Sequence, residues 1–221
     1  FRVNANRKRQ ASEARDMSEQ SPLQNSVNVF VDWAKARLDE MAANASTLQG
    51  NLDKLDANSR AQAEQAINQL NQWIQQGQND VKNAQAQGEA SVAQAKADLE
   101  ALWNNFQNNS GDWAGLIKDN QAMFQARAQA QVQAWQDMIN TYIQRLNDVH
   151  DQNKSQAEAQ VAQLQAEAKK AQADLTAKAE ELAKAGQSSW DAMSEALDQS
   201  RNAFAKSIET AAKNFNDAMK S

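Results

Sequence analysis

Apolar side chains recur along this chain at the spacing of a straight α-helix. From Leu52 to Phe106 an apolar or small residue occurs about every 3.6 residues, and a second stripe from Leu164 to Ala218 repeats that spacing. The only proline is Pro22, and there is no cysteine. Because nothing after Pro22 forbids helix, the pattern predicts an all-α protein.

A turn sequence separates the two stripes. Residues 108–112 read Asn-Asn-Ser-Gly-Asp, and Asp112 can cap a following helix. We therefore expect a long helix over 21–107, a turn over 108–112 and a long helix over 113–221. Two helices joined by so short a turn lie antiparallel, which gives a long helical hairpin with coiled-coil-like packing.

A folded-back arrangement is the alternative to the hairpin. A helix from 22 to 107 would be on the order of 130 Å long, far beyond the usual length. Sequence breaks near 46–51, 150–154 and 186–188 would shorten the rod. If these breaks become turns, the chain forms an elongated bundle of four or five helices.

Alanine accounts for much of the apolar content. The chain has 43 alanines among 221 residues, and its mean hydropathy is -0.82. Thin cores between closely approaching helices fit this composition better than a thick globular core. The net charge is -5 and neither half carries a basic stripe, so no nucleic-acid partner is expected. No apolar run is long enough to span a membrane.

Candidate chemistry is scarce. His150 is the only histidine, and the nearby Asp148 and Asp151 do not share a helical face with it, so a solvated face or a helix break explains it better than a metal site. The chain lacks a glycine-rich phosphate loop and a nucleophile elbow. We therefore predict no catalytic, cofactor-binding or metal-binding residues and no enzymatic activity.

Two apolar clusters are candidates for partner contact. The first flanks the predicted turn, where it forms either a local core or an exposed tip that docks on a partner or a lipid surface. The second lies near the C-terminus, where the helix would overhang its hairpin partner and favour self-association. The candidate contact residues are Trp103, Phe106, Trp113, Leu116, Ile117 and Phe124 in the first cluster, and Phe204, Ile208 and Phe215 in the second.

Residues 1–20 form a basic cluster with Arg2, Arg7, Lys8, Arg9 and Arg15. We expect a flexible, solvated tail there. A start at Phe1 is expected of a processed or truncated chain, in which such a cluster would follow a removed membrane anchor or targeting segment. The compartment stays open between membrane-associated, organellar and exported, and this segment is a second candidate for contact with a lipid surface.

The leading functional prediction is a non-catalytic scaffold, a helical rod that spaces or joins components of an assembly. In composition the chain is similar to phasins, the helical coats of polyester granules, most of all over Trp190 to Phe215, and more loosely to apolipoprotein helices. That resemblance implies an amphipathic coat on a lipid or polymer surface, which is the alternative. Glutamine- and asparagine-rich polar faces favour the scaffold, since lipid binders usually carry more lysine and arginine there.

Overall fold

The computed structural model is all-α, as the sequence predicts. It describes the backbone of residues 2–117, 120–149, 151–184 and 190–220, and side chains from Val27 onward except 118–119, 148, 150–152, 185–189, 215–216 and 218–221. The α-helices of the described residues are α1 (Arg2–Asn51), α2 (Ala57–Gln87), α3 (Glu89–Ile117), α4 (Asn120–Arg145), α5 (Asp151–Lys184) and α6 (Trp190–Lys220). Short 3-10 turns at Leu52–Lys54 and Leu146–Asp148 follow α1 and α4.

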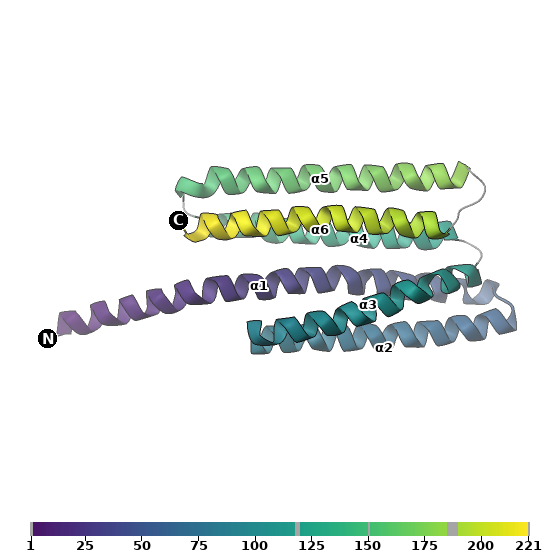
Figure 1. The fold of residues 1–221 in the computed structure, drawn as a ribbon, viewed down its shortest axis with the longest axis horizontal. Helices are drawn as coiled ribbons and strands as arrows, with labels where there is room; N and C mark the ends of the chain where they lie inside the picture. Colours follow the sequence, from purple (N-terminus) through teal and green to yellow (C-terminus); the bar gives the residue numbers. More distant parts are fainter. Residues whose placement is uncertain (1, 118–119, 150, 185–189, 221) are drawn as a thin grey trace.

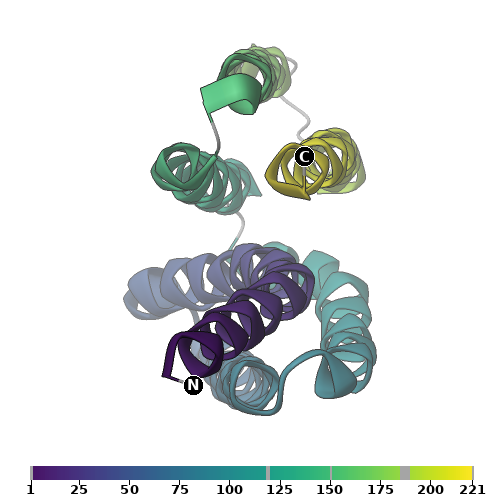
Figure 2. The ribbon, with the colours of Figure 1, turned by 90° about the vertical axis from the view of Figure 1, so that its left-hand side faces the viewer.

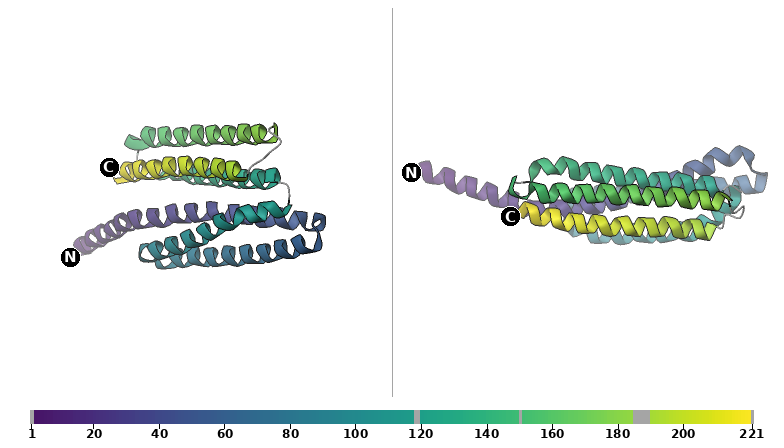
Figure 3. Two further views of the ribbon diagram at one scale, coloured as in Figure 1. Left: turned by 45° about the vertical axis from the view of Figure 1, so that its right-hand side comes forward. Right: turned by 90° about the horizontal axis from the view of Figure 1, so that it is seen from above.

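The helices form two layers that share one long axis. Figure 1 and the end-on view of Figure 2 show α1, α2 and α3 as one group of three and α4, α5 and α6 as another. We call these groups the first unit and the second unit. The two units meet mainly where α1 packs on α4. The view from above in Figure 3 shows the N-terminal part of α1 projecting beyond the other helices.

Each unit has its own apolar core. The first core gathers side chains such as Phe30, Met41 and Leu99 from α1–α3. The second gathers side chains such as Trp135, Leu164 and Leu197 from α4–α6. Both cores are thin, as expected from an alanine-rich chain, and each fills the space between three helices.

Close helix approach in the first unit depends on Gly77 of α2. A Cβ atom at this position would lie 2.6 Å from Cδ2 of Leu38 on α1 and 2.9 Å from Cδ1 of Leu99 on α3. These distances are shorter than van der Waals contact, so only glycine fits without movement of both leucines. The absence of a side chain at Gly77 therefore allows α1, α2 and α3 to approach closely at this level.

The predicted turn at 108–112 is wrong, because these residues lie inside α3. Polar side chains there bond within the helix: Ser110 is buried and donates from Oγ to the carbonyl of Gln107 at 2.9 Å. Gly111 faces Trp190, since a Cβ at Gly111 would lie 3.2 Å from the indole Cδ1. Packing against Trp190 of α6 thus accounts for Gly111. The long hairpin does not form, and the chain folds back into a bundle, as the alternative predicts, with six α-helices among the described residues in place of four or five.

The chain instead turns where the helices end. α1 ends at Asn51, within the range predicted for a break, and α5 begins at Asp151 after the 3-10 turn. Residues 185–189, which contain the third predicted break, lie outside the described residues. The turn between α2 and α3 is not anticipated by the sequence pattern, where Gly88 fits the apolar stripe. Gly88 has a φ of 78°, which lies in the left-handed region that glycine tolerates.

The segment predicted to be a flexible tail is helical from Arg2 as part of α1. Residues 2–21 contain neither glycine nor proline and are rich in good helix formers such as alanine, arginine and glutamine. The predicted helix start at Ser21 and Pro22 is likewise wrong, because α1 continues through both.

Candidate functional site

The predicted contact residues lie mostly in the interior of the bundle. Seven of them are buried: Trp103, Phe106, Trp113, Ile117, Phe124, Phe204 and Ile208. Leu116 is half-buried, and the side chain of Phe215 lies outside the described residues. The ring of Phe106 lies 4.9 Å from that of Trp103 and 6.1 Å from that of Trp113, between centroids. In this structure the aromatic cluster is part of the core and not an exposed tip.

The described part of the chain leaves little apolar surface for contact with a partner. Among the described residues, the one exposed large hydrophobic side chain is Ile143, at 38%. Contact through the seven buried residues therefore requires the helices to separate.

A buried ion cluster joins the two units. Glu40 of α1 lies between Arg127 of α4 and Arg201 of α6, and the three side chains are 1%, 0% and 6% exposed. Arg127 donates from Nε and Nη2 to Oε2 of Glu40 at 3.2 and 3.1 Å. Arg201 donates from Nε to Oε1 at 2.9 Å and from Nη2 to Oε2 at 2.8 Å. One carboxylate thus ties three helices together.

Aromatic rings of the first unit lie against the guanidinium groups. The Cζ of Arg127 lies 4.7 Å from the ring centre of Phe106, and that of Arg201 lies 4.4 Å from the ring centre of Trp103. Arg37 of α1 stacks on Trp33 at 4.1 Å. Such cation–π contacts lower the cost of removing arginine from water, and they place a charged layer against the first core.

The charged groups of the cluster shift one another's pKa values. Burial opposes ionisation of Glu40, but Arg201 and Arg127 outweigh it and lower the pKa of this carboxyl. Burial lowers the pKa of Arg127, while in Arg201 the attraction of Glu40 and Asp198 overcomes burial and raises the pKa. Arg37 is affected by burial and by repulsion from Arg201, which lower its pKa to about 10. Glu40 is therefore ionised at neutral pH.

Further polar contacts surround the cluster. Arg201 also bonds to Asp198, whose Oδ1 accepts from Nε2 of Gln107 on α3 at 3.0 Å. Gln131 of α4 donates from Nε2 to the carbonyl of Leu197 at 3.1 Å. Some buried polar atoms find no protein partner in the described part of the chain, among them Nη1 of Arg127 and the side-chain amide of Asn44. Polar contacts from α3, α4 and α6 therefore surround the ion cluster, and part of the hydrogen-bonding capacity of the buried side chains is not used.

An outer contact continues this interface along α1 and α4. Lys35 donates from Nζ to Oδ2 of Asp137 at 2.9 Å and to Oδ2 of Asp39 at the same distance. Asp32 lies one turn away, where burial raises its pKa to about 6 against the attraction of Arg145 and Lys35.

The cluster is suited to fixing helix register rather than to catalysis. Arginine does not give up its proton in proteins, and both oxygens of Glu40 are occupied and closed to solvent. A buried ion pair adds little net stability. If α1 slid along α4 and α6, however, Glu40 and the arginines would be buried without partners, and that cost disfavours other helix registers. The described residues contain no group of acidic or histidine side chains that could hold a metal ion, and none of their helices is apolar enough to cross a bilayer. His150 lies outside the described residues.

The burial of Glu40, Arg127 and Arg201 is not anticipated by the sequence pattern. Arg201 lies four residues after Leu197 and three before Phe204, which is the spacing of a buried helix face. Arg127 likewise follows Phe124 and Met123 at that spacing. A charged residue in the middle of an apolar stripe is the signal that could have identified them.

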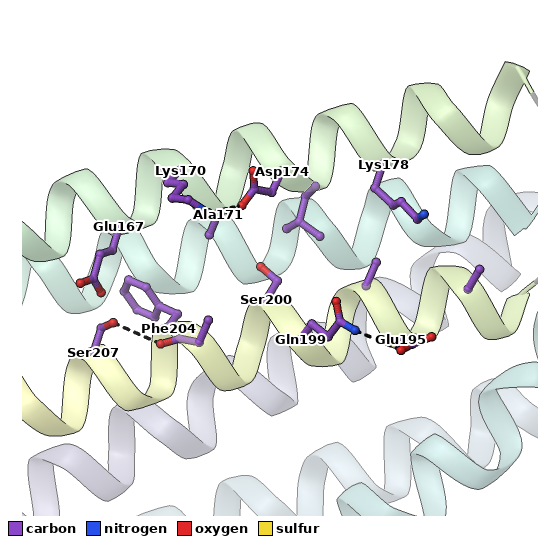
Figure 4. Close-up of a pocket in the computed structure, with 14 residues that line it drawn as sticks. Glu167, Lys170, Ala171, Asp174, Lys178, Glu195, Gln199, Ser200, Phe204 and Ser207 are labelled. Atoms are coloured by element: carbon purple, nitrogen blue, oxygen red, sulfur yellow. Dashed lines mark hydrogen bonds and ion pairs between the residues drawn. The ribbon is translucent and has the colours of Figure 1, made fainter.

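A groove along the second unit is the other notable surface. It is a hollow of about 680 Å³ between α5 and α6, with a smaller one of about 270 Å³ further along the same seam. Figure 4 shows Lys170, Asp174 and Lys178 on the α5 side, and Gln199 and Phe204 on the α6 side. Small side chains such as Ala171 form much of its lining.

No protein-family model matches the chain, and neither a curated protein nor a solved structure matches it. Functional inference therefore starts from the fold and from the arrangement of its side chains.

Proposed function

We propose that this chain is a non-catalytic amphipathic coat protein, which is closed in solution and opens to lay its helices on a lipid or polymer surface. The observation that carries the proposal is the burial of the predicted contact residues. Their apolar area is held inside the bundle, and the outward faces are polar. Amphipathic helices of this kind bind surfaces through the same apolar faces that pack the closed bundle.

The helix that opens first is α5. It contributes four alanines, of which only Ala157 is buried, and four larger side chains to the second core: Val161, Leu164, Leu175 and Leu182. It contributes nothing to the ion cluster, which uses α1, α4 and α6. Since buried apolar area stabilises at about 25 cal/mol per Å², a narrow alanine stripe is held less strongly than the faces of α4 and α6.

The charge of the chain favours binding to an uncharged surface over binding to an anionic membrane. Residues 151–184 carry five lysines against six acidic residues, and the whole chain has a net charge of -5. Attraction to anionic headgroups needs clustered basic residues, which this helix lacks. Binding is therefore expected to depend on apolar area, to vary little with salt, and to favour zwitterionic vesicles, oil droplets or polyester particles. No nucleic-acid partner is proposed.

A reversible disulfide cross-link between α5 and α6 tests the proposal. Ala171 of α5 and Ala203 of α6 both line the hollow, and the chain has no native cysteine. Ala171→Cys with Ala203→Cys would join the two helices when oxidised. We expect the reduced protein to float with phosphatidylcholine vesicles or polyester particles and the oxidised protein to stay behind.

The reduced protein is the matched control for its oxidised form. Equal binding by both forms would show that opening of this seam is not required. Failure of the wild-type chain to bind vesicles, oil droplets and polyester particles alike would refute the coat.

A scaffold is the second candidate, favoured by the projection of α1 beyond the other helices. A scaffold would keep its solution dimensions when lipid is added. Small-angle scattering with and without contrast-matched vesicles separates the two functions, because only the coat changes shape.

A further inference from the structure

The groove between α5 and α6 carries a charge pattern that is complementary to itself. Its α5 wall presents Glu167, Lys170, Asp174 and Lys178 in that order, so the signs alternate along the helix. When this series is reversed, each acidic position meets a basic one. A second α5 lying antiparallel would pair Glu167 with Lys178 and Lys170 with Asp174, each in both directions.

The α6 wall shows the same property. Glu195 lines the larger hollow and Lys206 lines the smaller one, and both side chains are exposed. In an antiparallel pair of α6 helices, Glu195 of one copy meets Lys206 of the other. The centre of this pairing falls between residues 200 and 201.

A single two-fold axis satisfies both walls. The Glu167–Lys178 pairs are centred between residues 172 and 173, and the Lys170–Asp174 pairs are centred on residue 172. The larger hollow is lined by residues 167–178 of α5 and 192–207 of α6, so the middles of its two walls lie close to the two centres. One axis crossing the seam at that level would bring all of these pairs together, as an isologous dimer requires.

We propose that this groove binds the same groove of a second copy of the chain, which forms a four-helix bundle of two α5 and two α6 helices. Alanine and serine line the floor, among them Ala196, Ala203 and Ser207, and small side chains allow helices to approach closely. Charged side chains stand at the rim, where they set register and orientation. This pairing does not rest on surface binding, so either proposal can fail alone.

Charge substitutions test the register. Lys170→Glu with Lys178→Glu turns all four α5 rim pairs into like charges, and we expect the dimer dissociation constant to rise at least about tenfold. Swapping all four signs, with Glu167→Lys and Asp174→Lys added, restores complementarity, and that variant should dimerise with itself but not with the wild type. Sedimentation velocity measures each association, and circular dichroism checks that each variant is helical.

The matched control is Lys169→Glu with Lys184→Glu. It makes the same change in net charge on the same helix, at exposed residues that do not line the hollows. It should associate like the wild type. A wild-type chain that stays monomeric at about 0.5 mM, or a four-site swap that dimerises no better than the two-site variant, would overturn the proposal.

Single cysteines give an independent test of where the axis lies. Gln199 and Gln163 are both exposed, line the seam and donate to a glutamate four residues away. In the proposed dimer Gln199 lies within about 5 Å of its copy along the helix direction, and Gln163 about 28 Å away. Mild oxidation should cross-link Gln199→Cys and leave Gln163→Cys monomeric on a gel. The reverse order, or equal cross-linking, would contradict this axis.

Discussion

Replacement of Glu40 by glutamine tests the role of the buried ion cluster most sharply. Glutamine keeps the size of the side chain and removes its charge. Arg127, which is fully buried, then loses the only acidic group to which it bonds in the described structure. Glutamine keeps one acceptor oxygen but places an NH2 donor where Glu40 has its second oxygen, so the two arginines share a single neutral acceptor. Arg201 keeps its bond to Asp198.

The expected cost is large because two buried cations lose their shared anion. Removal of one partner from a buried ion pair costs about 3–5 kcal/mol, since the remaining charge is left without compensation. Glu40 accepts four hydrogen bonds from the two arginines, so we place E40Q in that range. Replacement of Glu40, Arg127 and Arg201 together by methionine should recover most of the loss, because no buried charge remains.

Urea unfolding followed by circular dichroism measures these differences, with the slope of the transition as a check that each variant unfolds from the same compact state. The pKa of Glu40 is below its ordinary value of 4.5 in the folded chain. Its stabilisation is therefore present above pH 4.5 and is lost as the pH falls through the folded-state pKa. The gap between E40Q and wild type should shrink in acid. An E40Q loss under about 1 kcal/mol, or a triple variant as unstable as E40Q, would refute this reasoning.

Two further substitutions probe the packing and the interface. Gly77→Ala should destabilise the chain by about 1–3 kcal/mol in urea unfolding, because the new Cβ meets Leu38 and Leu99. The control Gly115→Ala, whose Cβ would have no atom within 4 Å, should be neutral or slightly stabilising. Equal effects of the two substitutions would contradict the close approach at Gly77. The raised pKa of Asp32, about 6 against 3.8, means that the folded chain holds this proton more tightly, so stability falls as the pH rises from about 4 to 6. Asp32→Asn should remove that fall and stabilise the chain at pH 7 but not at pH 3.5, and a constant difference across this range in thermal unfolding would count against it.

Helix content and helix faces could be predicted from the sequence because they depend on local spacing. Leu164, Leu175 and Leu182 lie on the stripe that faces the second core, as their period indicates. The turns were harder to predict. Gly88 fits the apolar period and yet ends α2, while Gly111 lies in a turn-like sequence and yet packs on Trp190. A glycine can end a helix or allow a neighbouring helix to pack closely, and which of the two occurs depends on the helix that packs against it.

The ion cluster depends on distant parts of the chain. Glu40 is 87 residues from Arg127 and 161 residues from Arg201. Spacing along one helix shows that a charged residue faces inward, but not which charge it will meet. The same limit explains the aromatic cluster: Trp103 and Phe106 were correctly grouped, but their burial follows from the fold of α1 and α6 over them.

The most direct test of the proposed coat function is a distance across the α5–α6 seam, measured with and without an apolar surface. Gln163 and Lys206 line opposite sides of the smaller hollow, and spin labels on cysteines at these sites report their separation by pulsed electron resonance. Dilution with unlabelled chain removes signals between copies. We predict a short distance in solution that lengthens by more than about 15 Å on phosphatidylcholine vesicles, as α5 leaves α6 to lie on the surface. A bound protein whose label distance stays unchanged would contradict opening of the bundle.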